Sequence, residues 1–343
     1  MNSSQKKKVF WMLFSVFLSA FTIWTVLKQN ENMSFSMLID ILGKTDKRWM
    51  IAAFASAGLF VFFEGVAICS ILKGISYKRS LKKGIIYSTS DVYFSAITPS
   101  ATGGQPASAY FMHKDGIPVG VASAALILNI MLYTASIVFL GIIAMILTPQ
   151  CFFSFGLPAK LLIILGLFGL TLTTVFFLTV LVKSEKIFSL LSKLLNFLHK
   201  KKVIHRLEPR IKKLYKIQDD YNNCSRLLAG KTSILVKAFF WNILQRTAQI
   251  IVPALVYLAM GGDRHLFTVL FSKQCLITIG YNFVPIPGAM GIADYLMIDG
   301  FSSVISTDEA FLLEMISRCI TFYICVAASG LITLAAYLRK RKK

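Results

Sequence analysis

The chain has 343 residues, of which 56% are hydrophobic and 15% charged, and its formal net charge is +21. A mean hydropathy of +0.66 is too high for a soluble globular domain and indicates an all-α polytopic membrane protein, with residues 1–343 forming one integral membrane domain. Apolar segments recur throughout, which excludes a large soluble domain. Two explanations of the positive charge compete, nucleic-acid binding and basic loops on the inner side of a membrane.

The chain begins with two predicted spans. Val9–Leu27 is free of charge and follows three lysines. A cleaved signal peptide is the alternative, but the run is long and no clean small-residue cleavage site follows, so we predict a retained span. Met50–Leu72 is the second span and carries one carboxylate, Glu64. The loop after it, Lys73–Gly84, holds five basic residues and no acid.

A broken segment follows this loop. Ile85–Ile97 is too short to cross a hydrocarbon core of about 30 Å, because a helix needs about 20 residues to do so. It ends at the polar run Thr98–Pro106 (TPSATGGQP), and Ala107–Met112 leads back to a charged turn. Irregular backbone at membrane depth survives only where it is buried in protein or lines a wet cavity. We therefore predict a re-entrant segment, followed by a third, uncharged span at Ile117–Thr148.

The middle of the chain combines a span with a long basic connection. After a turn with Pro149 and Pro158, Leu161–Val182 is a fourth span without charge. Lys183–Lys231 holds thirteen Lys/Arg against four acids. Apolar residues recur at helical spacing in its first part, with lysines between them, which predicts a basic amphipathic helix on the anionic inner leaflet. A nucleic-acid patch is the alternative, but no aromatic stacking platform or binding motif supports it.

The second half repeats the pattern of the first. Ser233–Met260 is the fifth predicted span. A second broken segment follows, in which the apolar pieces Leu266–Asn282 and Tyr295–Ile305 flank the Pro/Gly-rich run Phe283–Asp294. Ala310–Leu338 is the sixth span, and five basic residues follow it.

Six full spans and two re-entrant broken segments place both termini on one side. If that side is the cytoplasm, the inner stretches carry 26 of the 37 Lys/Arg and the outer stretches carry six. The positive-inside rule then predicts cytoplasmic termini in a cell membrane and accounts for the charge without nucleic acid. The two broken segments fall in three-part units of opposite orientation, which predicts a transporter-like inverted repeat. The competing explanation is that Pro and Gly are common in membrane helices, since the halves share no clear residue identity.

Charged residues within the apolar segments are candidates for function, because a charge at mid-bilayer costs about 2.5–3.5 kcal/mol on insertion scales. Glu64 and Arg246 lie in matching spans. Either these two residues form a structural ion pair, or Arg246 binds an anionic lipid headgroup. We favour Arg246 as the headgroup contact. Glu314 and Arg318 are spaced i,i+4 and either pair with each other or serve the site.

Two further acids stand beside the breaks. Asp91 and Asp294 act either as relay groups or as helix caps, and capping is the better interpretation for Asp294. The relay or structural set is therefore Glu64, Asp91, Asp294, Glu314 and Arg318.

The breaks also suggest an anion site. The N-terminus of a half-helix presents free N–H groups and a positive dipole end, which suits a phosphate. Glycines permit close backbone approach, and hydroxyl and amide side chains add neutral donors. The predicted headgroup-binding set is Thr98, Ser100, Thr102, Gly103, Gly104, Gln105, Arg246, Pro287 and Gly288.

No catalytic or metal-binding constellation stands out. The four histidines lie in loops far apart in sequence, and the six cysteines are scattered without a CxxC pair. The chain has no GxSxG, HExxH or Walker motif. We therefore expect no cofactor, no metal, no catalytic residue and no ATP-driven pump.

Two motifs in this order resemble the lysylphosphatidylglycerol synthase transmembrane-region family. The first is Thr98–Pro106, followed by a polar tetrapeptide and a long span without charge. The second, Pro285–Asp294 (PIPGAMGIAD), is similar to a Pro-x-Pro-Gly-Gly-x-Gly signature that an acidic residue usually follows. Ala289 replaces one glycine and Asp294 stands where glutamate is common, which leaves the role of this acid open. The resemblance covers essentially the whole chain.

The family includes the flippase half of the multiple peptide resistance factor, which moves lysylphosphatidylglycerol to the outer leaflet and reduces killing by cationic antimicrobial peptides. In that protein a soluble synthase domain that uses lysyl-tRNA follows the membrane part. Lys343 comes directly after the last span here, so the resemblance implies a stand-alone flippase-like protein and not an enzyme.

The resemblance implies translocation of an anionic, aminoacylated or polyprenyl-linked lipid across the bacterial cytoplasmic membrane. Membrane lipids are then the partners, and self-association of the chain is left open. Two alternatives stay open. One is the membrane part of a phosphatidylglycerol lysyltransferase system whose catalytic domain is separate. The other is a non-transporting scaffold for envelope assembly.

Overall fold

The computed structural model describes residues 45–98, 102–182 and 231–341 except 285, with residue 43 and scattered positions between 188 and 222. Among these residues the secondary structure is helical and none lies in a strand, which confirms the all-α class. The predicted first span, Val9–Leu27, lies outside the described residues. So does most of the basic connection Lys183–Lys231, whose predicted leaflet-binding helix stays a prediction.

The first half of the chain forms helices whose ends follow ordinary capping chemistry. The Asp46 carboxylate accepts a hydrogen bond from the Arg48 backbone N–H (2.8 Å) and caps the first of them. Gly116, with φ of +83°, reverses the chain in the turn before α6. The helices are α3 (Lys47–Gly74), α4 (Leu81–Ile97), α5 (Gly104–Lys114), α6 (Val119–Leu147), α7 (Pro149–Phe153) and α8 (Leu157–Val182).

The second half is more interrupted. Its elements are α11 (Thr232–Ile250), α12 (Val252–Ala259), η2 (Arg264–Leu266), α13 (Phe267–Asn282), η3 (Pro287–Ala289), α14 (Ile292–Ser302), α15 (Thr307–Arg318), the π-helical η4 (Cys319–Ile324) and α16 (Cys325–Arg341). The turn around η3 needs a left-handed backbone at Gly288, Ala289 and Gly291, with φ of 60°, 51° and 79°.

Four helices in the described part of the chain are long and apolar enough to cross a membrane: α3, α6, Leu157–Thr179 and Thr307–Arg339. They coincide with four of the six predicted full spans, so a membrane protein with several spans is supported and the count of six stays a prediction.

Two sequence expectations are wrong in detail. The predicted span Ser233–Met260 is divided into α11 and α12, because Pro253 in the first turn of α12 lacks a backbone N–H. Pro158 lies in the first turn of α8 and not in the preceding turn.

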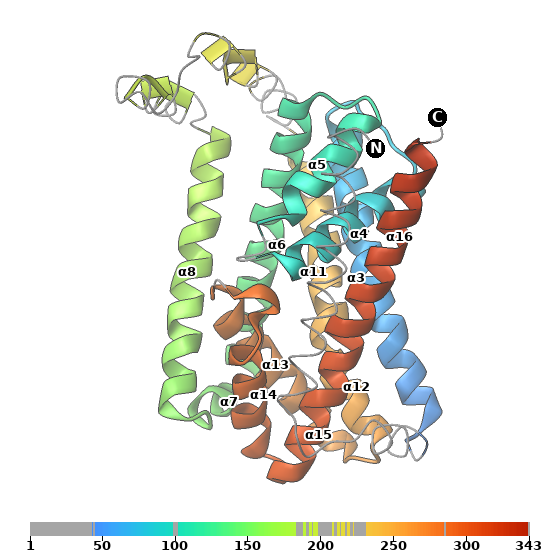
Figure 1. Cartoon of the computed structure of the whole chain (residues 1–343). Coiled ribbons are helices and arrows are strands. Elements are labelled where there is room, and N and C mark those ends of the chain that lie inside the picture. Colours follow the sequence, from blue (N-terminus) through green and yellow to red (C-terminus); the bar gives the residue numbers. More distant parts are fainter. Residues whose placement is uncertain are drawn as a thin grey trace.

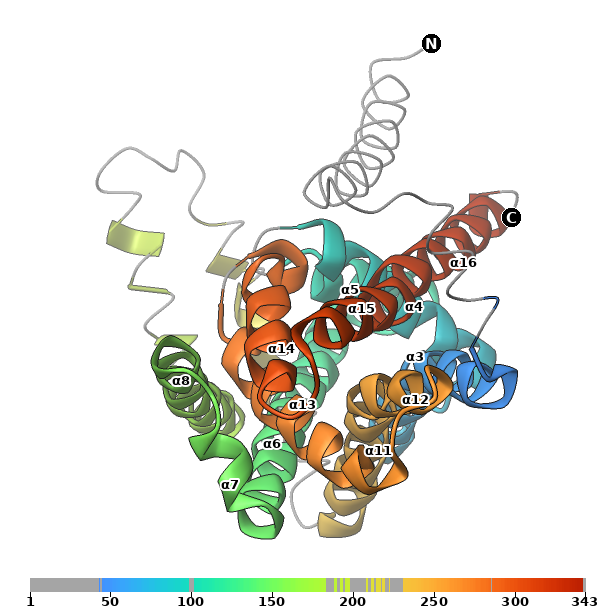
Figure 2. The ribbon, with the colours of Figure 1, turned by 90° about the horizontal axis from the view of Figure 1, so that it is seen from below.

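Each broken segment folds as a pair of short helices. Figure 1 shows α4 and α5 in the upper half of the molecule and α13 and α14 in the lower half, while α3 and α6 run the full height. We call α4–α5 the first hairpin and α13–α14 the second hairpin. Viewed from below in Figure 2, α14, α15 and α12 are nearest the viewer and α8 stands at the edge of the bundle.

The two hairpins make equivalent contacts with the helices around them. The first helix of each hairpin packs against long helices of the other half, α4 against α16 and α13 against α6 and α8. Each hairpin also packs against the spans before and after it: α3 and α6 for the first, α12 and α15 for the second. The leading helices of the two halves, α3 and α11, pack against each other. This reciprocal pattern is the one an inverted repeat would produce.

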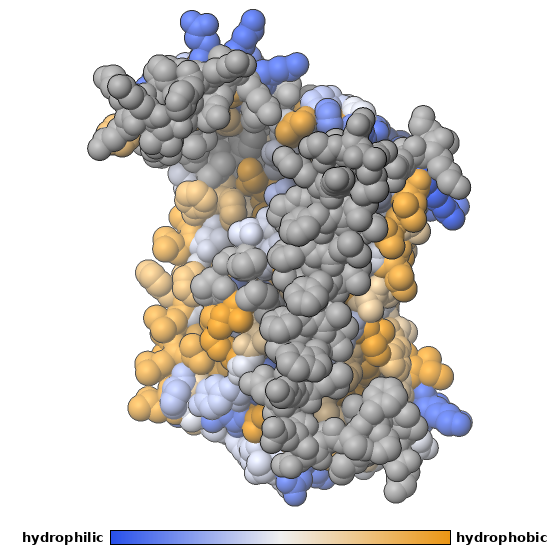
Figure 3. Space-filling view, viewed as in Figure 1, coloured by the Kyte–Doolittle hydropathy of each residue, from blue (hydrophilic) through white to orange (hydrophobic). Residues whose placement is uncertain are grey.

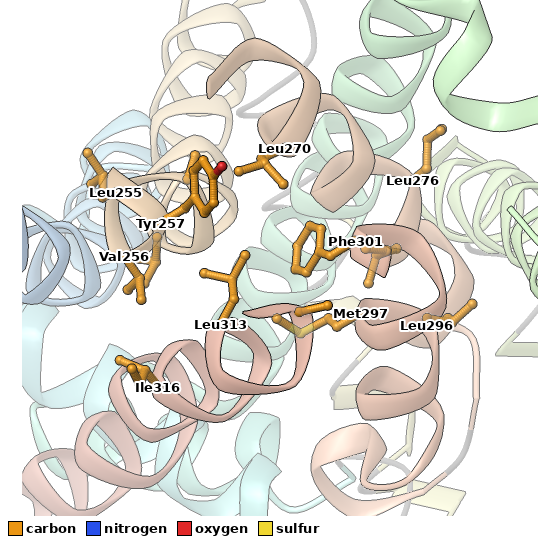
Figure 4. Close-up of a cluster of buried hydrophobic side chains, with 14 of the residues drawn as sticks. Leu255, Val256, Tyr257, Leu270, Leu276, Leu296, Met297, Phe301, Leu313 and Ile316 are labelled. Carbon is orange, nitrogen blue, oxygen red and sulfur yellow. The ribbon is translucent and has the colours of Figure 1, made fainter. Parts of the chain in front are cut away.

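Hydrophobic side chains fill the lower half and cover the sides. In Figure 4, side chains of α12, α13, α14 and α15 converge in one cluster, with Leu255, Leu270, Phe301 and Leu313 among them. Figure 3 shows hydrophobic residues along the visible sides between hydrophilic residues at the top and bottom. A hydrophobic belt of this kind is what a hydrocarbon environment requires.

Candidate functional site

The site begins where α3 and α4 touch. Gly65 and Gly84 lie face to face, and a Cβ at Gly65 would be 2.9 Å from the Gly84 carbonyl carbon. This contact places Glu64 beside α4, where the Ser88 hydroxyl is 2.9 Å from a Glu64 carboxylate oxygen and 2.9 Å from the Val61 carbonyl oxygen. Glu64 and Ser88 are both buried. The small residues therefore bring a carboxylate into the helix interface.

Asp91 lies one turn further along α4 and joins Glu64. Ser88, which binds Glu64, stands three residues before Asp91 on α4, so the two buried carboxyl groups lie close together. Asp91 Oδ1 accepts a hydrogen bond from the Ser95 hydroxyl (3.1 Å), and Asp91 Oδ2 accepts one from the Gln105 amide nitrogen (2.9 Å). Two buried carboxyl groups are thus surrounded by neutral hydrogen-bond donors.

The first break closes around this pair. The Thr98 hydroxyl donates to the Phe94 carbonyl (2.6 Å) and accepts the Gly103 N–H (2.8 Å), which ties the end of α4 to the start of α5. A Cβ at Gly104 would overlap Asp91 Oδ1. The N-terminus of α5, which the sequence suggested as a phosphate site, therefore faces the protein's own carboxyl group.

Arg246 of α11 provides the cation of the site. Its guanidinium lies 4.2 Å from the Tyr133 ring centroid and 5.4 Å from that of Phe60, both cation–π contacts. One terminal nitrogen donates to the Gln249 side-chain oxygen (2.7 Å), whereas the buried Nε has no hydrogen-bond partner.

The ion pair between Glu64 and Arg246, which the sequence analysis considered as the alternative to a headgroup contact, is not formed. Within the described residues no carboxylate oxygen lies within 4.0 Å of an Arg246 nitrogen. Glu64, Asp91 and Arg246, which we call the inner triad, thus meet without pairing. They come from three helices, α3, α4 and α11.

The second break has its own charge cluster. Arg318 Nε is 2.9 Å from Asp294 Oδ1, and an Arg318 terminal nitrogen donates to the Gly288 carbonyl (3.1 Å). The other Asp294 oxygen accepts the Gly291 N–H (2.8 Å) and caps α14. Glu314 is buried one helical turn before Arg318 on α15. Arg318 therefore pairs with Asp294 and not with its i−4 neighbour Glu314, and it holds the break in place from outside the hairpin.

The two breaks approach each other through η3, which contacts α4. Gly288 lies in that element, and a Cβ there would overlap the Phe322 ring of η4. Thr102 is exposed beside the first break, Ser100 lies outside the described residues, and only the backbone of Pro287 is described. The structure thus gathers Asp91, Gly104, Gln105 and Arg246 in one place.

Several residues of the site have weak or no signals in the sequence. Ser95 stands one helical turn after Asp91, a spacing that could have indicated it. Gln249 stands three residues after Arg246 on α11, a spacing that could also have indicated it. Tyr133 carries no such signal, because only the packing of α6 against α11 brings it to Arg246. Lys273 is fully buried in α13, with its ammonium 2.5 Å from the Ser154 hydroxyl and over the Phe155 ring. Its charge within an apolar segment could have marked it.

The arrangement suits an anion more than a metal. No set of three or more His, Cys, Asp or Glu side chains in the described ranges could hold a metal ion. A guanidinium with an unpaired N–H, stacked on aromatic rings, can donate hydrogen bonds to a phosphate oxygen.

Long apolar helices, two short hairpins and charged side chains buried between the helices define a polytopic membrane protein. The family model described as Lysylphosphatidylglycerol synthase TM region matches residues 12–329, and the chain belongs to this family. The resemblance of the two motifs is thereby confirmed. The chain is also similar to a UPF0104 membrane protein of Archaeoglobus fulgidus, with 22% identity over 258 residues, covering 73% of this chain and 74% of that protein.

Proposed function

We propose that this protein moves a lipid with an anionic headgroup between the leaflets of the cytoplasmic membrane, without itself being an enzyme. In this proposal the six spans, the two re-entrant hairpins and the inverted repeat of the sequence analysis apply, and both termini are cytoplasmic. The headgroup passes through the polar interior between the hairpins while the acyl chains stay in the bilayer. Phosphatidylglycerol, its aminoacylated form and polyprenyl-phosphate lipids share the phosphate that this route requires.

The observation that carries the proposal is the state of Arg246. A buried guanidinium normally pairs with a carboxylate, because an uncompensated charge in a dry interior is costly. Here two carboxyl groups are close, yet Arg246 pairs with neither and leaves Nε without a partner. A phosphate oxygen would satisfy this donor and form the direct ion pair that the guanidinium lacks.

Gln105 adds a complementary group. Its amide nitrogen is bound to Asp91, and its buried side-chain oxygen has no hydrogen-bond partner. An acceptor on α5 and a donor on α11 therefore both lie beside Asp91. They could bind the hydroxyl or ammonium part and the phosphate part of one headgroup. Because both atoms are buried, headgroup entry requires the first hairpin to move relative to α3 and α11.

Lipid movement in proteoliposomes tests the proposal. Phosphatidylglycerol with a fluorescent headgroup label is quenched from outside, and the rate at which the inner pool becomes accessible is measured. Arg246→Gln should slow this rate by about tenfold or more, because a charge-assisted hydrogen bond contributes about 1.5–3 kcal/mol and each 1.36 kcal/mol is tenfold in rate.

The matched control is Lys237→Gln, which removes an exposed charge from the same helix and should leave the rate unchanged. Wild-type vesicles that exchange labelled lipid no faster than protein-free vesicles would refute the proposal. Equal rates for the Arg246 variant and wild type would remove Arg246 from the route.

A further inference from the structure

Polar side chains form a stripe along one face of α11. Asn242, Gln245, Arg246 and Gln249 are spaced i, i+3, i+4 and i+7, so they share one side of the helix. Asn242 is fully buried, and Gln245 is only 2% exposed. Polar groups in a dry helix interface are costly unless each finds a hydrogen-bond partner. The stripe therefore needs an explanation that Arg246 alone does not give.

α6 presents polar and aromatic residues to this stripe. The Asn242 amide nitrogen is 3.2 Å from the Asn129 side-chain oxygen, and both residues are buried. One turn further along α6, the Tyr133 ring lies under the Arg246 guanidinium. We call Asn129 and Tyr133 of α6, together with the stripe of α11, the polar seam. It extends from Arg246 toward the N-terminal end of α11.

The polar seam contains hydrogen-bond acceptors without donors. The Asn242 amide nitrogen also donates to the Ala238 carbonyl (2.9 Å), which identifies the other side of this amide as the oxygen. Within the described residues, Asn242 Oδ1 and Gln245 Oε1 are buried and accept no hydrogen bond. Polar contacts that hold membrane helices together account for the Asn129–Asn242 pair but not for these two oxygens. A bound group with donors of its own would satisfy them.

The start of α5 adds two more such atoms. Gln105 Oε1 and Ser108 Oγ, one turn apart, are buried and have no hydrogen-bond partner in the described part of the chain. α5 and α11 both pack against α6. Amide oxygens accept hydrogen bonds and donate none. A group that binds to the amide oxygens of these helices must therefore supply donors.

We propose that the polar seam binds an uncharged polyhydroxyl group that is esterified to the phosphate held by Arg246. Glycerol, inositol and sugar headgroups have this chemistry. The inference rests on the proposed function and adds the chemical class of the headgroup. Asn242 and Gln245 are the specificity-determining residues of this subsite.

The spacing along α11 suits such a group. Asn242 precedes Arg246 by four residues, or about 6 Å along the helix axis, and Gln245 stands between them. A polyol carries hydroxyls on consecutive carbons, so a chain or ring that begins at the phosphate presents donors along this direction. Each hydroxyl can also accept a hydrogen bond while it donates one, which suits a surface of amides.

An ammonium group fits the polar seam less well. Its ordinary partner is a carboxylate, and the carboxyl groups of Glu64 and Asp91 already accept hydrogen bonds from neutral donors. The acceptors without donors are neutral amides, which do not offset the desolvation of a cation. A cation at Asn242 would also lie one helical turn from the charge of Arg246. Hydroxyls meet neither obstacle.

Binding of matched lipids is the first test and needs no variant. Dihexanoyl phosphatidylglycerol and dihexanoyl phosphatidylpropanol have the same phosphodiester charge and the same number of headgroup carbons, but the second has no headgroup hydroxyl. Isothermal titration calorimetry measures their affinities for the detergent-purified protein. We expect phosphatidylpropanol to bind about tenfold more weakly, because it leaves buried acceptors unpaired. Equal affinities would overturn the inference.

Gln245→Met assigns the preference to the polar seam. Methionine has nearly the shape of glutamine but no amide, so the preference for phosphatidylglycerol should fall to about threefold, with Asn242 still present. Gln150→Met, at an exposed glutamine of α7, is the matched control and should keep the full preference. An undiminished preference in Gln245→Met would place the hydroxyl contacts elsewhere and overturn the assignment.

Thermal unfolding without lipid distinguishes a binding role of Gln245 from a structural one. Replacing a buried, unpaired acceptor by an apolar side chain of the same shape should leave the unfolding temperature equal or higher. A lower unfolding temperature for Gln245→Met would show that the amide already has a partner in the lipid-free protein, which would overturn the subsite.

Two further lipids compare hydroxyls with an ammonium group. Dihexanoyl phosphatidylinositol carries a ring of hydroxyls, and the lysyl ester of dihexanoyl phosphatidylglycerol carries ammonium groups. We expect phosphatidylinositol to bind at least as tightly as phosphatidylglycerol and the lysyl ester to bind more weakly. Tighter binding of the lysyl ester than of both would assign an ammonium group to the seam and overturn the inference.

Transport measurements separate the inference from the proposed function. Acyl-labelled forms of phosphatidylglycerol and phosphatidylpropanol are compared in proteoliposomes. Equal affinities with equal, protein-dependent rates refute the polyhydroxyl subsite and leave lipid translocation standing. Preferential binding of phosphatidylglycerol without transport of any lipid supports the subsite and refutes translocation.

Discussion

Two arginines show how local surroundings decide what a buried charge does. Arg318 has a carboxylate at 2.9 Å and a backbone carbonyl at 3.1 Å, so its charge is neutralised within the protein and stabilises a turn. Arg246 has a neutral amide and two aromatic rings. The aromatic faces stabilise the cation without consuming its hydrogen-bond donors. At the scale of the residue, this difference separates a structural arginine from one that can receive a ligand.

Gly104 gives a prediction at the same scale. A methyl group there would overlap Asp91 Oδ1 and lie 2.7 Å from the Asp91 carbonyl oxygen, so Gly104→Ala must push α5 away from α4. We expect a loss of about 1–3 kcal/mol in stability, as for other overpacked sites. Thermal unfolding in detergent measures it. Gly58→Ala is the control, because nothing lies within 4 Å of a Cβ at Gly58. Equal unfolding temperatures for the two variants would contradict the packing at Gly104.

Individual residues of the site were only partly predictable from the sequence. Glu64, Asp91 and Arg246 were found because a charge within an apolar segment is costly and needs a reason. Their arrangement was not, since it depends on Gly65 and Gly84 bringing α3 and α4 into contact. The i,i+4 spacing suggested Glu314 as the partner of Arg318. In the structure the partner is Asp294, which belongs to the second hairpin.

At the scale of the element, the most unusual feature is the interrupted last span. Arg318 ends α15, and the six residues of η4 that follow are π-helical before α16 resumes. A π-helical turn is rare and often marks a functional site. It adds a residue per turn directly after Arg318, in the stretch that faces the second break through Phe322.

Arg318→Lys tests whether this element holds the break. A lysine ammonium cannot reproduce the fork that binds both Asp294 and the Gly288 carbonyl, so the turn should open more often. Because Asp294 is about a third exposed, we expect a loss near the low end of the 1.5–3 kcal/mol of a charged hydrogen bond, or about tenfold faster hydrogen exchange. Mass spectrometry of peptides covering 286–291 measures it. Arg264→Lys, at an exposed arginine, is the control, and unchanged exchange in Arg318→Lys would contradict the role.

Helices were more predictable than their interruptions. Charge-free runs of more than 20 residues marked α6 and α8, and Pro/Gly runs marked both breaks. The division between α11 and α12 was missed, because one proline in an apolar run does not reveal whether the helix bends or ends. The π-helical stretch left no trace in the sequence, since CITFYI suits an ordinary helix equally well.

At the scale of the molecule, the reciprocal packing explains how so short a chain can enclose polar groups. Each hairpin is covered by spans from both halves, α4 by α3 and α16, and α13 by α12 and α6. The helices that lead into the two breaks are thereby packed between helices of the same protein, and Gly104 and Ala289 at the tips are buried. The sequence indicated two units of opposite orientation from charge alone. The sequence could not show that each hairpin packs against a helix of the opposite half, because the two halves share no clear residue identity.

The orientation of the hairpins gives the last prediction. If both are re-entrant, the residues on either side of each hairpin lie on one face of the membrane. Cysteines placed at Lys78 and Lys114, which flank the first hairpin and are exposed, should react with a membrane-impermeant maleimide only in opened cells. Cysteines at Arg264 and Asp308, which flank the second hairpin, should react in intact cells. The basic residues around the first pair set this direction through the positive-inside rule.

The pairwise design makes the labelling decisive. The unsubstituted chain reports any reaction of its own cysteines, of which Cys151, Cys275 and Cys325 are buried. Opposite accessibility within either pair would mean that the hairpin crosses the membrane, which would remove the inverted repeat and with it the shared polar interior. Reversed accessibility of both pairs would keep the architecture and invert its direction, so that the inner triad would open first to the outside.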